Sequence, residues 1–225
     1  MTLMVDFDFR ADFGPVRDQG RRPTCLAFAA SDAHRYARQH SGPLCVEWLF
    51  YHAARRAHTG LTDGITIPDT RTILKNPGQP DEAFWPYSSA LSDSQGWGPP
   101  TGNPPLWQCE SQTCQANPTL VRASVGNGVP VVIIVLASSM FKMPDTWEMD
   151  GTEVIIGMDE EPSAGDPHAV VVVGSGFWCN EPVLLVRNSW GLKWGNQGCA
   201  WVRERYLASR LRGAFTISKG DCHIL

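Results

Sequence analysis

Residues 168–198, HAVVVVGSGFWCNEPVLLVRNSWGLKWGNQG, decide the fold of the second half of this 225-residue chain. Two runs rich in Val and Leu, at 168–174 and 182–187, have the length and composition of buried strands. A turn containing Asn180 and Pro182 separates them. If the two strands pair, Asn188, which ends the second, lies beside His168, which opens the first.

The rest of the chain divides into a helical part and a β part. Helical spacing and capping residues predict helices over 25–38, 46–58, 69–75 and 118–125. Further strands are predicted over 131–137 and 198–203. Residues 76–118, rich in Pro, Gly, Ser and Asn, are interpreted as a crossover between two subdomains. Helices followed by strands indicate an α+β protein.

Charge and hydropathy exclude several classes of protein. The formal net charge of −4 and the pI of about 5.8 give no general electrostatic reason to bind nucleic acid or an anionic membrane. No apolar run approaches the ~18 residues of a membrane span, and residues 1–14 lack the apolar core of a signal peptide. We therefore expect a cytoplasmic protein, and leave open export as an effector or origin as a fragment of a longer precursor.

The cysteines predict no metal site and no cofactor. There are seven of them, at positions 25, 45, 109, 114, 179, 199 and 222. Neither a CxxC nor an HxxxH pair occurs among the cysteines and histidines. Cys109 and Cys114 are near enough in sequence to form a disulfide, but the lack of a signal peptide favours two thiols.

Cys25 lies where a polar loop becomes a helix. A thiol on the first turn faces the positive end of the helix dipole and free backbone N–H groups, and both favour the thiolate. A catalytic cysteine also needs a base and a group that orients the base. His168 can supply the base and Asn188 can accept its ring N–H, with Trp190 covering that hydrogen bond.

Gln19 completes the set, because an oxyanion needs donors and its side-chain amide can act with the backbone N–H of Cys25. Each residue also has an ordinary structural interpretation: a small buried thiol for Cys25, a turn residue for Asn188, a solvated loop residue for Gln19. The other histidines are interpreted as solvated or satisfied side chains: His34, His40, His52, His58 and His223.

This ordered set resembles the papain-like cysteine peptidases. The most specific element is NSWGLKWGNQG at 188–198. His168 follows Cys25 within the roughly 130–150 residues typical of that family, and Asn188 lies slightly beyond. The segments PDEAFWPY at 80–87 and VRASVGNGVPVVIIV at 121–135 extend the resemblance over most of the chain.

The resemblance implies a two-lobed fold with a substrate cleft between the lobes. It predicts a mainly helical lobe over 11–115, whose central helix starts at the nucleophile, and an antiparallel, barrel-like β lobe over 116–225, with residues 1–10 as a candidate addition to the β lobe. Cys25 would be the nucleophile, His168 the general acid and base, Asn188 its orienter and Gln19 the oxyanion donor. Further cleft residues implied by the resemblance are Gly60, Gly64, Trp190, Trp194 and Ser218.

The implied function is a thiol endopeptidase that acts on a peptide or protein, with a protein inhibitor or dedicated substrate partner as a further candidate. Alternatives are a partner-specific processing peptidase or effector, a transpeptidase, and an inactive binding module. The sequence departs from the family's CGSCW run, because Arg22 replaces the disulfide-forming cysteine and Leu26 the tryptophan. Only 24 residues precede Cys25, so we expect a compact member without a pro-segment, of bacterial or intracellular type.

Overall fold

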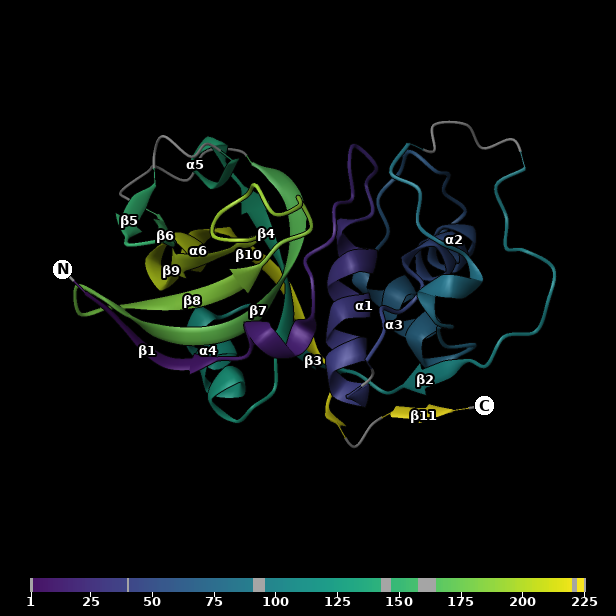
Figure 1. The fold of residues 1–225 in the computed structure, drawn as a ribbon, viewed down its shortest axis with the longest axis horizontal. Helices are drawn as coiled ribbons and strands as arrows, with labels where there is room; N and C mark the ends of the chain where they lie inside the picture. The colour runs from purple at the N-terminus through teal and green to yellow at the C-terminus, as the bar shows by residue number, and fades with distance from the viewer. Residues whose placement is uncertain are drawn as a thin grey trace. The chain divides into compact units, whose positions relative to one another are not determined.

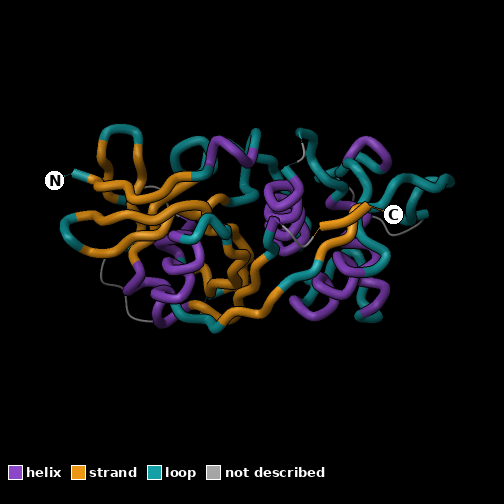
Figure 2. The backbone as a smooth tube through the Cα atoms, turned by 90° about the horizontal axis from the view of Figure 1, so that it is seen from below, coloured by secondary structure: helices purple, strands orange, loops and turns teal. Residues whose placement is uncertain are grey.

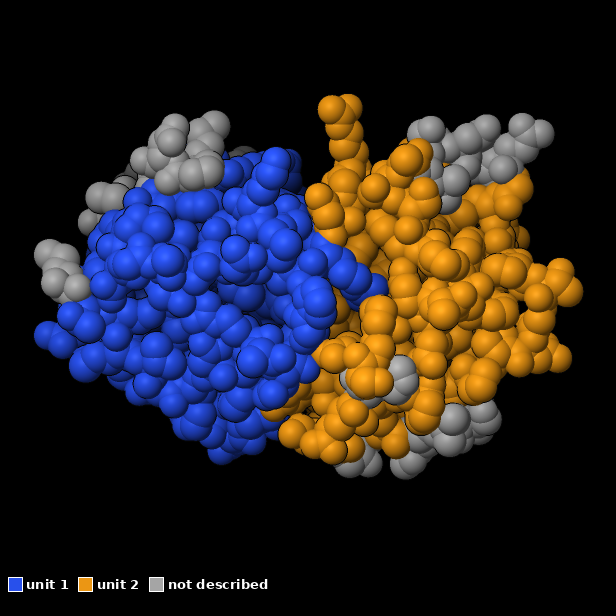
Figure 3. Space-filling model, in the orientation of Figure 1, with its two compact units in different colours: residues 1–17, 113–216 blue, residues 18–112, 217–225 orange. Residues whose placement is uncertain are grey.

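The computed structural model describes residues 2–39, 41–90, 96–142, 147–157, 165–219 and 222–224. The chain divides into two compact units, shown in different colours in Figure 3. Unit 1 contains Met1–Arg17 and Thr113–Thr216, and unit 2 contains Asp18–Gln112 and Ile217–Leu225. Long helices characterise unit 2, and most strands belong to unit 1 (Figure 1, Figure 2).

Unit 2 is built on three helices, α1 (Cys25–Arg38), α2 (Val46–Arg56) and α3 (Ile67–Lys75). Side chains of α1 are buried along most of its length, and they include Phe28, Ala30 and His34. The N-terminus of α3 is capped by the Thr66 hydroxyl, which accepts a hydrogen bond from the backbone N–H of Asp69 (3.2 Å). The short 3-10 helix η2 (Glu82–Phe84) and strand β2 (Trp107–Cys109) lie in the region predicted as a crossover.

Unit 1 contains a nine-stranded sheet with the order β3-β10-β4-β7-β8-β9-β6-β5, and β1 pairs with β7 off this path. The bounds of its strands are as follows: β1 (Leu3–Asp8), β3 (Gln112–Cys114), β4 (Val131–Ala137), β5 (Glu148–Asp150), β6 (Glu153–Ile156), β7 (Asp166–Trp178), β8 (Glu181–Arg187), β9 (Cys199–Arg203) and β10 (Leu211–Thr216). Strands β6 and β9 pair in parallel, whereas β4 pairs antiparallel with β10 and β7, β7 with β1 and β8, β8 with β9, and β5 with β6.

Helices cover the apolar core of unit 1. The helices are α4 (Pro118–Gly126), α5 (Ser139–Lys142) and α6 (Glu204–Arg210), and the 3-10 helix η1 (Arg10–Phe13) follows β1. Val125 of α4 and Leu207 of α6 pack with sheet residues such as Ile133, Val172 and Val186, all of which are essentially buried. Strands β4, β7 and β8 are buried on both faces over most of their length, which accounts for the continuous Val-rich runs of the sequence.

The two compact units differ at their ends from the lobes expected from the sequence. The sequence assigned residues 116–225 to the β lobe, but residues 217–225 cluster with unit 2. There strand β11 (Cys222–Ile224) pairs antiparallel with β2, and Cys222 lies opposite Cys109. Residues 11–17, assigned to the helical lobe, belong to unit 1. Residues 217–225 join unit 2 because β11 pairs with β2, and no local sequence pattern predicts a pairing between such distant segments.

Two further expectations concern the thiols and membranes. All seven cysteines are thiols in the structure, Cys109 and Cys114 included. Within the described part of the chain, no helix has both the length and the apolar content required to cross a membrane.

The close approach of β1 to β7 generates a prediction about stability. A Cβ added at Gly176 would lie 2.3 Å from the backbone oxygen of Met4, so the strands would have to separate. We expect Gly176→Ala to lower the free energy of unfolding by about 1–3 kcal/mol, as overpacking does in other cores, measured by urea unfolding. Gly64→Ala is the matched control, because a Cβ at Gly64 meets nothing within 4 Å. Equal stability of the two variants would contradict the prediction.

Candidate active site

Cys25 is the first residue of α1 and is partly exposed. Thr24 precedes it, and its backbone oxygen accepts a hydrogen bond from Phe28 N (3.0 Å), which starts the helix. The Thr24 hydroxyl does not cap the helix, because it bonds the Tyr87 hydroxyl at 2.8 Å. The thiol therefore lies at the end of the helix where backbone N–H groups lack intrahelical partners.

The loop before Cys25 is held by the same tyrosine. Tyr87 donates its hydroxyl proton to the backbone oxygen of Gln19 (2.8 Å), so the Thr24 hydroxyl must be the donor to Tyr87. The Gln19 side chain is only 6% exposed, and its Nε2 donates to the backbone oxygen of Arg22 (2.8 Å). This bond fixes the orientation of the Gln19 amide on the same loop as the thiol.

Arg22 forms a buried ion pair with Glu47 of α2. Its Nη1 and Nη2 lie 2.6 and 2.7 Å from the two carboxylate oxygens, and both side chains are at most 5% exposed. Trp97 Nε1 also donates to Glu47, and Arg22 donates to the backbone oxygen of Ser88. This ion pair attaches the loop before Cys25, here called the thiol loop, to α2. Arg22 forms it from the position at which the resemblance implies a disulfide-forming cysteine. The sequence identifies Arg22 as a departure from the family pattern, but its pairing with Glu47 arises only in the tertiary fold.

His168 and Asn188 lie together in unit 1. His168 Nε2 is 2.7 Å from Asn188 Oδ1, and the same oxygen accepts from the backbone N–H of Ser189 (2.7 Å). Because a carbonyl oxygen only accepts, Nε2 of His168 carries the proton, and Nδ1 is the nitrogen left to exchange a proton with another group. The pairing of β7 with β8 brings the two residues together in the way the sequence pattern predicts.

Aromatic rings surround this hydrogen bond. The ring centroid of Trp190 is 4.3 Å from that of His168, and Phe141 is 6.2 Å away. Burial lowers the pKa of His168 to about 4, while the bond to Asn188 raises it and the Lys142 cation lowers it. The imidazole is therefore neutral at physiological pH in this environment, and Phe141 and Lys142 are site residues that the sequence analysis did not identify.

The remaining predicted cleft residues differ in their surroundings. Trp194 is 5% exposed, packs in the core of unit 1 and donates its Nε1 to the backbone oxygen of Phe141 (3.0 Å). Trp194 therefore packs beside Phe141, and its role in a substrate cleft stays a prediction. Gly60 and exposed Gly64 lie on the loop after α2, and half-buried Ser218 lies in the returning end of unit 2.

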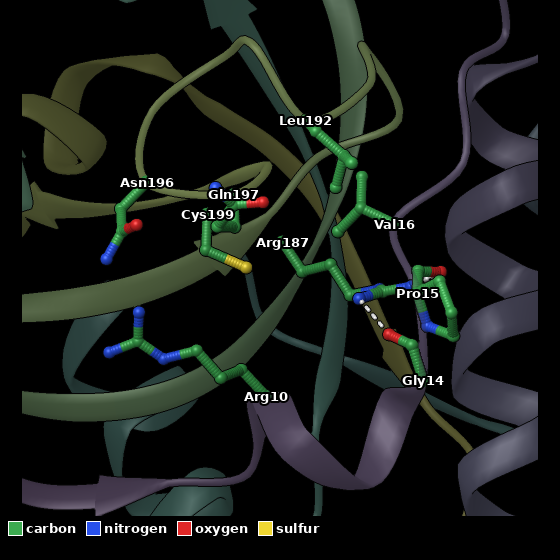
Figure 4. Close-up of a pocket in the computed structure, with 9 residues that line it drawn as sticks. All are labelled: Arg10, Gly14, Pro15, Val16, Arg187, Leu192, Asn196, Gln197 and Cys199. Carbon is green, nitrogen blue, oxygen red and sulfur yellow. Dashed lines mark hydrogen bonds between the residues drawn. The ribbon is translucent and has the colours of Figure 1, made fainter.

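Unit 1 also contains a pocket of about 400 Å³ that does not include the His168–Asn188 pair in its lining. Figure 4 shows Arg10, Arg187 and Cys199 around it, together with residues of the loop that follows Trp190. Arg187 is buried and donates to the backbone oxygens of Gly14 and Pro15. These bonds make Arg187 a structural element of the pocket wall.

Solved structures of low sequence identity share this fold. Xylellain, a cysteine protease from Xylella fastidiosa, superposes with a TM-score of 0.73 at 18% identity, covering 96% of this chain and 91% of that one. A structure from a study of the mite allergens Blo t 1 and Der p 1 gives 0.75 at 22% identity, covering 97% and 72%. The Carica candamarcensis cysteine protease CMS1MS2 in complex with E-64 gives 0.67 at 19% identity, covering 94% and 97%.

The sequence itself matches the family model described as papain family cysteine protease over residues 3–211. The chain therefore belongs to the papain family. Cathepsin J of Rattus norvegicus is 28% identical over 196 residues, which are 82% of this chain and 55% of that protein. A probable cysteine protease of Arabidopsis thaliana, RDL2, is 28% identical over 207 residues, which are 88% and 54%. The chain thus spans about half the length of these curated relatives.

The Arg22–Glu47 pair predicts strong coupling between the thiol loop and α2. Removing one partner leaves the other charge buried, so Arg22→Met or Glu47→Leu alone should lower the free energy of unfolding by about 3–5 kcal/mol. The double variant should lose less than the sum of the two single losses. Urea unfolding of the four proteins measures this coupling, and additive losses would contradict it.

The lowered pKa of His168 predicts a loss of stability in acid. In the unfolded chain, imidazole takes up a proton as the pH falls through about 6.5, whereas the folded chain holds His168 neutral down to about 4. The unfolded state binds more protons between these values, so the stabilising contribution is full above about 6.5 and is lost as the pH falls through that window. We expect urea unfolding to show a smaller acid loss for His168→Gln than for wild type.

The exposed His58 provides the control for this measurement. His58→Gln should follow the wild-type dependence on pH, because that side chain lies outside the buried aromatic environment. An acid loss in His168→Gln as large as in wild type would contradict the assignment of the effect to His168.

Proposed function

We propose that the chain is a cysteine endopeptidase that hydrolyses peptide bonds through Cys25 and an acyl-enzyme intermediate. The observation that carries the proposal is the 2.7 Å hydrogen bond from His168 to Asn188 beneath Trp190. It fixes the tautomer of a buried, neutral imidazole, whose Nδ1 can then accept a proton. The family and the place of Cys25 at the start of α1 support the same chemistry.

The proposed reaction requires the thiol of Cys25 and Nδ1 of His168 to come within hydrogen-bond reach. The sulfur attacks the carbonyl carbon of the substrate, and the thiol proton passes to Nδ1. The backbone N–H of Cys25 and Nε2 of Gln19 donate hydrogen bonds to the oxyanion. His168 returns the proton to the leaving amine, and water then hydrolyses the thioester with His168 as general base.

The charge state of the pair follows from competing influences. Burial favours neutral imidazole at His168, whereas a thiolate next to the ring favours imidazolium. Cys25 and His168 should therefore titrate as a coupled pair, and the dependence of kcat/KM on pH should be bell-shaped.

The substrate class is a peptide or protein, and a protein inhibitor or a dedicated substrate partner would occupy the same surface. In this proposal Gly60 and Gly64 lie along the substrate backbone, and Ser218 helps to form a specificity pocket. Trp190 acts as a cover for the His168–Asn188 bond. A cytoplasmic site of action stays a prediction from the sequence.

Covalent labelling tests the proposal. The epoxide E-64, which is bound in the Carica candamarcensis protease structure, should add one adduct to the reduced wild type, read by intact mass. Cys25→Ser should gain no adduct, and His168→Ala should label about 100-fold more slowly or worse because the base is lost. Asn188→Ala should fall between wild type and His168→Ala.

Cys179→Ser is the matched control, because Cys179 is an exposed thiol outside the proposed site. It should label at the wild-type rate, and it should cleave a mixed peptide library as wild type does, whereas Cys25→Ser should not cleave the library. A folded wild type that takes up no E-64, or that labels at a cysteine other than Cys25, would overturn the proposal.

A further inference from the structure

Unit 2 contains a second group of chemically competent side chains, none of which belongs to the proposed catalytic set. His34 lies on α1, Cys109 ends β2 and Cys222 begins β11. The ligand atoms of these three residues all lie within 4.8 Å of one another. His34 and Cys109 are at most 1% exposed, and Cys222 is half-buried. The antiparallel register that places Cys222 opposite Cys109 brings the sulfur atoms together.

The hydrogen bonds around Gln79 determine the tautomer of His34. Gln79 Nε2 donates to Ser31 Oγ (2.6 Å) and to the backbone oxygen of Cys45 (2.8 Å), so its Oε1 must accept. That oxygen is 3.1 Å from His34 Nδ1, which therefore carries the ring proton. Nε2 is left with a lone pair, is buried, makes no regular hydrogen bond to a described residue, and faces the Cys222 sulfur.

A buried lone pair without a donor is costly unless something binds it. We propose that His34 Nε2 and the sulfurs of Cys109 and Cys222 bind a zinc ion. Two thiolates and one imidazole are typical zinc ligands, and a metal-bound histidine usually donates its other ring N–H to a carbonyl oxygen, the role that Gln79 fills here. Water would complete the tetrahedron.

The geometry requires little rearrangement. Two sulfurs bound to one tetrahedral zinc ion at about 2.3 Å are about 3.8 Å apart, so atoms within 4.8 Å need to close by about 1 Å at most. Binding replaces the protons of the Cys109 and Cys222 thiols, and these protons pass to the solvent. No oxidation is involved.

Arg38 is a charged residue that acts on the proposed zinc ligands. Its guanidinium stacks over the Trp107 ring at 3.0 Å and interacts electrostatically with both cysteines. A zinc ion with two thiolates has no net charge, so the guanidinium faces a neutral centre. A cross-strand disulfide between Cys109 and Cys222 is the competing occupant. It is less consistent with the structure, because it would leave His34 Nε2 buried without a partner.

The proposed ion would connect α1 with the last strand of the chain. β11 has only three residues, and unit 2 holds it through pairing with β2. The site is independent of the proposed peptidase function, because none of its ligands belongs to the proposed catalytic set.

Zinc content of the full chain tests this inference. The Cys25→Ser background is used throughout, so that zinc cannot bind the thiol of the proposed active site. Reduced protein freed of excess metal should retain one zinc ion per chain, measured by elemental mass spectrometry. Cobalt substitution should give a thiolate-to-metal charge-transfer band. In the same background, Cys222→Ser, Cys109→Ser and His34→Gln should each weaken zinc binding at least tenfold.

Cys179→Ser in that background is the control and should keep the zinc ion and the cobalt band. A chelator should lower the thermal midpoint of unfolding of the parent protein and leave that of Cys222→Ser unchanged. This measurement does not require the variants of the buried residues His34 and Cys109 to fold. Zinc absent from the reduced parent, or equal zinc affinity in Cys222→Ser, would overturn the proposal. A Cys109–Cys222 linked peptide that persists in protein purified with zinc would overturn it in favour of the disulfide.

Discussion

The pairing of β7 with its neighbours is the constraint on which unit 1 depends. This strand pairs with β1, β4 and β8, and all three pairings are antiparallel. Its side chains are buried on both faces over most of its length, so a shift in register would displace every contact at once. His168 near its start and Asn188 just after β8 meet because this register is fixed. The orientation of the imidazole is thus a consequence of sheet geometry.

Buried polar groups specify the loop that precedes Cys25 in unit 2. The loop before α1 has no disulfide, and its shape follows from the Arg22–Glu47 pair and the hydroxyl relay through Tyr87. A buried ion pair adds little net stability compared with apolar packing, but a broken one is costly. Such a pair therefore selects one loop conformation, and that conformation fixes the backbone next to Cys25.

Much of this arrangement could be predicted from local sequence, and the limits have physical causes. Apolar runs and capping residues identified α1, α2, β4 and the β7–β8 pair, because these elements bury continuous faces. Strands β5 and β6 are too short for their patterns to predict them, whereas β1 pairs with β7 within residues 1–10, the segment expected as a candidate addition to the β lobe. Side-chain partners were harder still: the Thr24 hydroxyl bonds Tyr87, and Trp194 enters the core, through contacts that only tertiary structure creates.

The same limit explains why ligand spacing did not indicate His34, Cys109 and Cys222. Spacing rules detect ligands that one turn or one hairpin holds together, whereas these residues come from a helix and two strands at distant points of the chain. What identifies them is the accounting of buried polar atoms. The carboxamide of Gln79 has its donors committed to Ser31 and Cys45, so the imidazole of His34 must donate to it. The remaining lone pair supports the proposed zinc site more directly than any sequence motif, because burial makes an unsatisfied atom costly.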